Sequence, residues 1–164
     1  MELGTTIIGL GATALCIVPF VLMRRSTKKK EHELINGLKV IAASYNREVS
    51  IYDCGIDFAV GMSAARDFVF FVKIRNEEML EQCIPLNAIQ KCRIDSTKRS
   101  IKTKDGHESV TDKLELTFLP IVKSIAASQF EFFNSEDHFQ LNGELQLIKK
   151  WEALINEILS GKKP

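Results

Sequence analysis

One uncharged stretch limits what this chain can fold into more than any other feature. Residues 3–23, LGTTIIGLGATALCIVPFVLM, contain no charged side chain. As a helix they would span roughly 31 Å at about 1.5 Å per residue, which matches the hydrocarbon core of a bilayer. A cleaved signal peptide would have a cationic start, a shorter apolar core and a small-residue cleavage site. Here the start is ME, the apolar run is long and it ends in FVLMRR, so the sequence predicts one uncleaved transmembrane helix over residues 1–23.

Five cationic side chains follow within seven positions: Arg24, Arg25, Lys28, Lys29 and Lys30. Because positive charge stays on the cytoplasmic side, they predict that the N-terminus lies outside and the rest of the chain in the cytoplasm. Near an anionic leaflet they could contribute roughly 5 kcal/mol, at about 1 kcal/mol each. An apolar helix would already anchor the chain more firmly. We therefore interpret this run as an orientation signal of a single-pass protein of the inner membrane.

Within the uncharged stretch, Thr5, Gly9 and Thr13 recur at every fourth position. Small residues at this spacing let two membrane helices approach closely. Such residues are also common in membrane helices that make no specific contact. A helix–helix contact is therefore one of two interpretations.

Residues 24–48 form a basic juxtamembrane segment and a linker. Apolar residues at Leu34, Leu38, Ile41 and Tyr45 have helical spacing. The polar side of this segment carries both signs of charge, whereas helices lying in a lipid surface are usually rich in Lys and Arg there. We therefore expect a short amphipathic helix that packs on the following domain.

Residues 49–164 are expected to form one domain of about seven short strands and a closing helix. The strands are predicted from short runs of β-branched and aromatic residues. These runs are VSIYDC, DFAVGM, DFVFFVKIR, EQCIPL, IQKCRIDST, DKLELTF and QFEFFNS. Within IQKCRIDST, Cys92 and Ile94 are expected to point inward, and Asp105-Gly106 is a hairpin signal.

The last segment is predicted to be an amphipathic helix, because its apolar residues recur at steps of three and four. They are Leu147, Ile148, Trp151, Leu154, Ile155, Ile158 and Leu159. Asn142 is the expected N-cap and Gly161 the expected stop signal.

The sequence contains no recognisable catalytic or metal-binding motif. His32, His107 and His138 are scattered, and none has a Cys or His at metal-ligand spacing. Nucleophile-elbow, metalloprotease and phosphate-loop motifs are missing from the chain. We therefore predict a protein that is not an enzyme and that needs no cofactor or metal.

Charge and cysteine content point to a cytoplasmic domain that does not bind nucleic acid. Residues 31–164 carry 17 cationic and 20 anionic side chains. Nucleic-acid-binding domains are usually basic, so this class of partner is not expected. Cys54, Cys83 and Cys92 are an odd number without a CxxC pair, which suits a reducing compartment.

A second basic cluster lies in STKRSIKTKDG and consists of Lys98, Arg99, Lys102 and Lys104. It could bind anionic lipid headgroups at a loop that faces the membrane. Lysines on exposed strand edges also protect against aggregation without binding anything. The second interpretation is favoured.

Four stretches carry a resemblance to pleckstrin-homology-like domains: FAVGMSAARDFVFFVKI, CIPLNAIQKCRI, DKLELTF and GELQLIKKWEALINEI. The chain also resembles short bacterial membrane proteins with one N-terminal helix and such a domain. The resemblance implies a bent sheet or barrel of about seven strands closed by the C-terminal helix. It also implies binding of lipid headgroups or of protein segments.

The first hairpin, SIYDCGIDFAVGM, lacks the cations that the lipid site of this family uses, so protein binding is favoured. The expected function is a membrane-anchored cytoplasmic interaction module, an accessory or scaffold subunit of a membrane protein complex. A headgroup-binding domain is the alternative, and an enzyme without a recognisable motif is a third hypothesis.

Overall fold

The computed structural model describes residues 27–103 and 106–161. The chain divides into two compact units, Met1–Glu33 and Leu34–Pro164. Of the first unit, only residues 27–33 are described, and they are helical. All the strands found in the described residues lie in the second unit.

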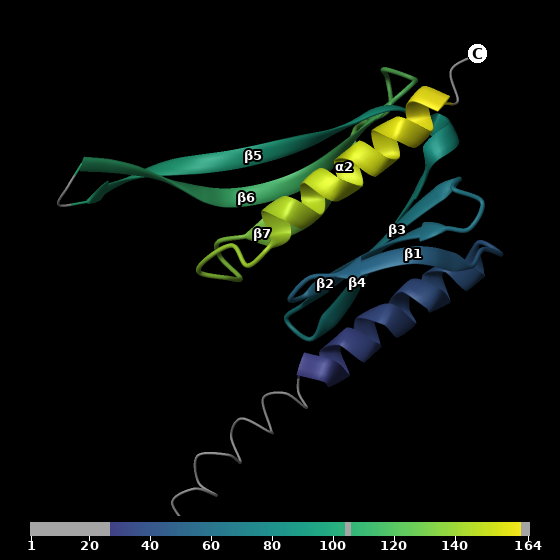
Figure 1. Cartoon of the computed structure of the whole chain (residues 1–164), viewed down its shortest axis with the longest axis horizontal. Helices are drawn as coiled ribbons and strands as arrows, with labels where there is room; N and C mark the ends of the chain where they lie inside the picture. Colours follow the sequence, from purple (N-terminus) through teal and green to yellow (C-terminus); the bar gives the residue numbers. More distant parts are fainter. Residues whose placement is uncertain (1–26, 104–105, 162–164) are drawn as a thin grey trace, which may run out of the picture. The chain divides into compact units, whose positions relative to one another are not determined.

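The first layer of the second unit is a four-stranded antiparallel sheet in the order β1-β2-β3-β4 (Figure 1). Its strands are β1 (Val49–Cys54), β2 (Phe58–Ser63), β3 (Phe68–Arg75) and β4 (Glu78–Pro85). Both faces of β2 and of the middle of β3 are buried, because each face is covered by a different element.

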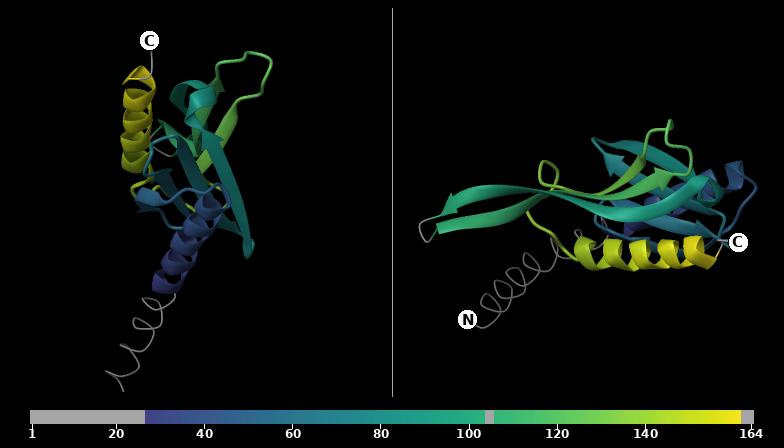
Figure 2. Two further views of the ribbon diagram at one scale, coloured as in Figure 1. Left: turned by 90° about the vertical axis from the view of Figure 1, so that its right-hand side faces the viewer. Right: turned by 90° about the horizontal axis from the view of Figure 1, so that it is seen from above.

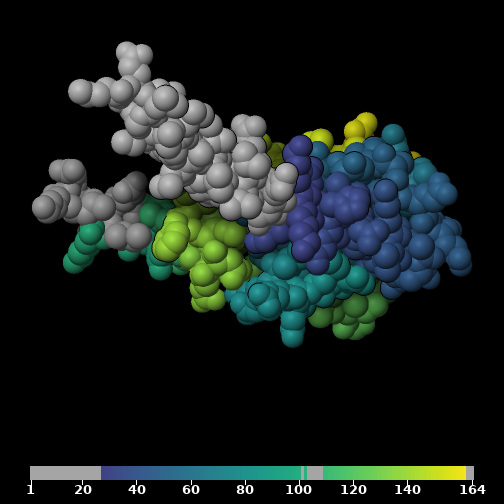
Figure 3. Space-filling model, turned by 90° about the horizontal axis from the view of Figure 1, so that it is seen from below, coloured from purple at the N-terminus to yellow at the C-terminus, as the bar shows by residue number. Residues whose placement is uncertain are grey.

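The helix of residues 27–44 covers the outer face of this sheet from Leu34 onward (Figure 3). Leu34, Leu38 and Ile41 are buried in one cluster with Phe70 and Val72 of β3. The predicted helical spacing is therefore confirmed for these three residues, and the helix packs on the domain. Tyr45, the fourth residue of the predicted stripe, lies beyond the end of the helix and is exposed.

The second layer is a three-stranded antiparallel sheet in the order β5-β6-β7. Its strands are β5 (Ile89–Thr103), β6 (Gly106–Pro120) and β7 (Ser128–Asn134), and β4 is connected to β5 by the short 3-10 helix Leu86–Ala88. The C-terminal helix α2 (Glu144–Gly161) contacts all three strands (Figure 2).

The main core lies between the inner faces of the two sheets and α2. Phe58 and Phe71 of the first sheet pack against Phe130 and Phe132 of the second, with ring centroids between 4.7 and 5.7 Å apart. From α2, Trp151 and its neighbours one turn away are fully buried in the same cluster. The buried positions of α2 are among those that its helical spacing predicts.

The predicted fold class is wrong about how the strands combine. They form two separate sheets rather than one bent sheet or closed barrel. The chain enters the 3-10 turn directly after Pro85, so the ladder of the first sheet ends there. Side chains also form hydrogen bonds with the backbone of both outer strands of the second sheet. Asn156 accepts one from the N–H of Cys92 in β5, and Lys73 donates one to the carbonyl of Glu131 in β7.

The predicted fold class and localisation also included a membrane-spanning helix, and this is corrected here. No helix within residues 27–103 and 106–161 is both long and apolar enough to cross a bilayer. In α2, charged residues such as Lys149, Lys150 and Glu157 occupy the exposed side of the helix. A single-pass protein of the inner membrane is therefore not supported.

The residues on which that prediction was based are mostly outside the described part. The stretch 3–23, with Thr5, Gly9 and Thr13, and the cations Arg24 and Arg25 lie outside it. Lys28, Lys29 and Lys30 are described, and their side chains are exposed on the first helix.

The start of α2 differs from the expectation that Asn142 caps it. The carbonyl of Gly143 accepts the hydrogen bond from Leu147 N–H at 3.1 Å, so Gly143 occupies the cap position. Its φ of +100° is one that glycine adopts without strain. The carboxylate of Glu144 folds back to accept a hydrogen bond from the backbone N–H of Asn142.

Candidate functional site

The β5–β6 hairpin extends well beyond the rest of its sheet (Figures 1 and 2). The two strands remain paired from Thr97 and Lys113 to Thr103 and Gly106, whereas β7 pairs with β6 only as far as Lys113. We call residues 97–103 and 106–112 the arm. The described arm side chains on β5 are all exposed.

The four cations of the predicted headgroup site do not share one environment in the arm. Arg99 Nε lies 3.0 Å from Asp112 Oδ1 of the opposite strand, so its charge is paired within the arm. Lys98 and Lys102 are exposed, share the other face of β5, and have no ion-pair partner among the described side chains. Lys104 lies outside the described residues.

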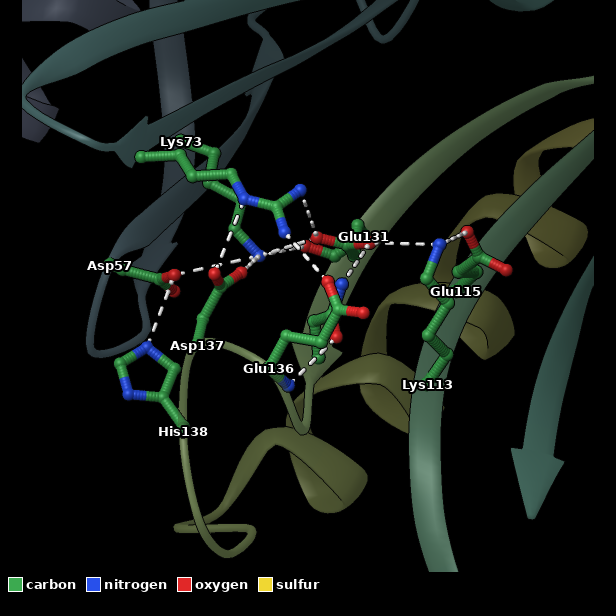
Figure 4. Close-up of polar contacts among 10 residues, drawn as sticks. Asp57, Lys73, Lys113, Glu115, Glu131, Glu136, Asp137 and His138 are labelled. Carbon is green, nitrogen blue, oxygen red and sulfur yellow. Dashed lines mark hydrogen bonds and ion pairs between the residues drawn. The ribbon is translucent and has the colours of Figure 1, made fainter. Parts of the chain in front are cut away.

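A buried ion network joins the two sheets at one end of the core (Figure 4). Its centre is the ammonium group of Lys73, whose side chain is only 3% exposed. Lys73 Nζ lies 3.0 Å from Glu131 Oε1, 3.5 Å from Asp57 Oδ2 and 3.8 Å from Asp137 Oδ2. It also donates a hydrogen bond to the carbonyl of Glu131 at 3.4 Å. A buried ammonium group needs such partners, because moving it out of water without a charged partner would cost several kcal/mol.

Two further cations complete the pairing of Glu131. Lys113 Nζ lies 3.2 Å from its Oε2, and Arg75 Nη1 lies 4.0 Å from its Oε1. Burial by itself would raise the pKa of Glu131, but the hydrogen bond and charge of Lys73, followed by those of Lys113, lower it overall. The pKa of Lys113 is raised, chiefly by its hydrogen bond to Glu131.

His138 approaches the same network from the loop after β7. Its Nε2 lies 3.2 Å from Asp57 Oδ2, but no hydrogen bond is formed at this nitrogen or at Asp137 Oδ2, and both atoms are buried. Within the described ranges, no group of three or more His, Cys, Asp or Glu side chains is arranged to hold a metal ion. The ammonium group of Lys73 lies between the carboxylates of Asp57, Glu131 and Asp137. We therefore interpret the network as one that holds the two sheets together.

Two aspartates near the ends of the early strands also serve structure. Asp53 Oδ2 accepts a hydrogen bond from Trp151 Nε1 at 2.9 Å and thereby ties β1 to α2. Asp67 Oδ2 accepts one from Arg47 Nε at 2.9 Å, which is the main reason that the pKa of Asp67 is lowered. Neither carboxylate is left free for acid–base chemistry.

The sequence reasoning did not single out Lys73 and Glu131. A signal was nevertheless available, since Lys73 has the same strand parity as Val69 and Phe71, which face the core. A lysine at a core-facing position needs a buried partner. The sequence could not show that this partner lies 58 residues away.

The side-chain amide of Asn156 closes part of the outer edge of β5. Its Oδ1 accepts a hydrogen bond from Cys92 N–H at 3.0 Å, and its Nδ2 donates one to the Cys92 carbonyl at 2.8 Å. Cys92 itself is fully buried, and burial raises the pKa of its thiol to about 12. This thiol is therefore not a nucleophile near neutral pH.

The outer edge of β4 is open within the part of the chain that the structure describes. β4 pairs only with β3, and the side chains of Glu78, Leu80, Glu81 and Gln82 are exposed. Open edges of this kind are sites at which another extended strand can be added.

No protein-family model matches this chain, and the comparisons with curated proteins and with solved structures also gave no match. The resemblance to pleckstrin-homology-like domains therefore stays a prediction.

Proposed function

We propose that residues 34–161 form a protein-interaction module, an accessory or scaffold part of a protein complex, and that the arm is its docking element. The observation that carries this proposal is the length of the β5–β6 pairing, which continues past the end of β7.

Stability alone gives little reason for the arm. A two-stranded ribbon without a covered face is at best marginally stable in water. The described arm side chains on β5 are exposed and add nothing to either core cluster. Contact with a partner would supply the missing cover and would pair the free backbone groups.

The state of the polar groups supports binding rather than catalysis. Lys73, Asp53 and Asp67 all have partners that fix their positions within the fold. In contrast, aliphatic side chains are exposed on the loop between β6 and β7, where Ile121, Val122 and Ile125 are each more than half exposed. Grouped exposed aliphatic residues are typical of protein contact surfaces.

The proposal can be tested by crosslinking in cells that make the full chain. A photoreactive amino acid replaces Thr97 in the arm, and the matched control carries it at Glu157 on the exposed side of α2. We expect stoichiometric crosslinks to a defined protein from Thr97 only. Equal yields at both positions, or none at Thr97, would refute the arm as docking element.

Binding of anionic headgroups is the second candidate, because Lys98 and Lys102 are exposed and unpaired among the described side chains. This function predicts that the full chain binds soluble inositol phosphates and that replacing the two lysines, as in K98E/K102E, lowers this affinity. Retained affinity in K98E/K102E would exclude these residues as the headgroup site.

A further inference from the structure

We infer that the arm of one copy of this chain pairs with the open edge of β4 in a second copy. The two strands run antiparallel, with Lys98 opposite Glu81. This inference rests on the proposed function in one respect, because it takes the arm as the docking element and names its partner.

The backbone groups of β4 that face outward follow from its pairing with β3. Leu86 N–H donates to the Asp67 carbonyl at 2.8 Å, and in an antiparallel ladder such bonded positions recur at every second residue. The even-numbered residues of β4 therefore face β3, and Met79, Glu81 and Cys83 turn N–H and C=O outward. Pro85 belongs to the outward series but has no N–H, so the usable edge ends at Cys83.

The outward groups of the arm follow in the same way from Cys92, whose N–H and C=O both point away from β6 to Asn156. The irregularity between Thr97 and Lys98 places its extra residue, Asp112, on β6 and leaves β5 regular. Lys98 and Lys102 therefore also turn their backbone groups outward. Asn156 blocks the edge at Cys92, and the arm lies on the open part of β5 beyond it.

The charges on these two edges are complementary. The edge of β4 and its adjoining turn expose Glu81 and Glu77, and the arm exposes Lys98 and Lys102, all without an ion-pair partner among the described side chains. When Lys98 stands opposite Glu81 in an antiparallel pair, the same direction of the strand brings Lys102 toward the turn that carries Glu77. At the Lys98–Glu81 position both strands offer outward backbone groups, so charge and hydrogen bonding fit the same register.

The same charges disfavour the competing pairings. Two β4 edges would place carboxylates against carboxylates, and two arms would place ammonium groups against one another. Charged edges normally prevent strand addition, but unlike edges attract, so this arrangement selects one contact among three. In this contact each chain uses the arm as one edge and β4 as the other, so association is head to tail and gives a ring or a chain.

Charge reversal with complementation tests this inference on the full chain by sedimentation equilibrium at low ionic strength. We expect the wild-type chain to self-associate, and K98E/K102E and E77K/E81K each to weaken association by about tenfold. An equimolar mixture of the two variants, and the chain carrying all four changes, should regain it. Association through other segments would not respond to this exchange of charge.

Glu78 supplies the matched control. It is exposed on β4, but its backbone faces β3 and its side chain lies on the opposite face from Glu81. E78K should therefore weaken association less than E81K. Circular dichroism and thermal unfolding of each variant check that the fold is retained.

A monomeric wild-type chain, double variants that associate like wild type, or a mixture that fails to recover would each overturn the inference. If the wild-type chain is monomeric while Thr97 still crosslinks to another protein, only this inference fails and the proposed function stands. If Thr97 crosslinks to nothing, the proposed function fails as well.

Discussion

At the scale of single residues, Asn156 acts as a short substitute for a neighbouring strand. Its amide offers one acceptor and one donor, the same pair that a peptide group offers, and both are used on Cys92. The bonded groups belong to a fully buried residue, so water cannot easily replace them. Asn156 therefore satisfies the backbone of β5 where no strand continues the sheet.

Replacing Asn156 with Ala should lower the free energy of unfolding by about 1–3 kcal/mol, because it leaves buried backbone groups of Cys92 without partners. Urea unfolding followed by the fluorescence of Trp151 measures the change. The control, Glu157→Ala, alters an exposed neighbour on the same helix and should stay within about 0.5 kcal/mol of wild type. Equal losses in the two variants would argue against the substitute-strand role.

Some residue-scale features could be predicted from the sequence. The inward positions of Cys92 and Ile94 are confirmed, since one is buried and the other half-buried. The role of Asn156 could not be predicted, because it depends on a contact across 64 residues of sequence. A polar residue on a predicted helix gives no local sign that it faces a strand edge.

At the scale of elements, the β1–β2 turn is shaped by the ring of Phe58. A Cβ atom built on Gly55 would lie 2.2 Å from Phe58 Cε1. The ring has no exposed surface and packs against Phe132 with centroids 4.7 Å apart, so it has little room to move. Only glycine fits at this turn without displacing the aromatic core.

Gly55→Ala should therefore destabilise the fold by about 1–3 kcal/mol through overpacking. Thermal unfolding monitored by circular dichroism provides the measurement. Gly161→Ala is the matched control, because a Cβ there meets nothing within 4 Å. A Gly55→Ala chain as stable as the control would show that the ring can shift.

The elements themselves were easier to predict than their arrangement. Val49–Cys54 and the stripe of α2 follow directly from residue type and spacing. The division into two sheets depends on the short turn after Pro85. The residue pattern of a strand does not indicate which of two sheets the strand joins. The extent of the arm was likewise not visible, because DKLELTF is only the inner part of a 15-residue strand.

At the scale of the whole folded unit, the network around Lys73 makes the contact between the layers sensitive to pH. The pKa of Glu131 is lower in the folded state than its ordinary value of about 4.3. Such a group contributes stability above its unfolded pKa, and this contribution is lost as the pH falls through the folded pKa. Acid should therefore weaken the fold, beginning below about pH 4.5.

Lys73→Met should reduce the free energy of unfolding at neutral pH by about 3 kcal/mol, because it leaves three carboxylates without their shared cation. The difference from wild type should shrink as the pH is lowered toward 3, because the contribution of Glu131 to the network is lost as its carboxylate is protonated. Urea unfolding at a series of pH values tests this, with Lys39→Met, at an exposed position, as the control. A loss that does not change with pH would contradict the ionic explanation.

The order of the strands also fixes the order in which the fold can be completed during synthesis. The first sheet is made entirely before β5 begins, but the cover over Phe58 and Phe71 comes from β7 and α2, which are made last. At about 5–20 residues per second, the 3-10 turn and the end of α2 leave the ribosome on the order of 4–15 s apart. For that time the nascent chain exposes an aromatic sheet face that the finished protein hides.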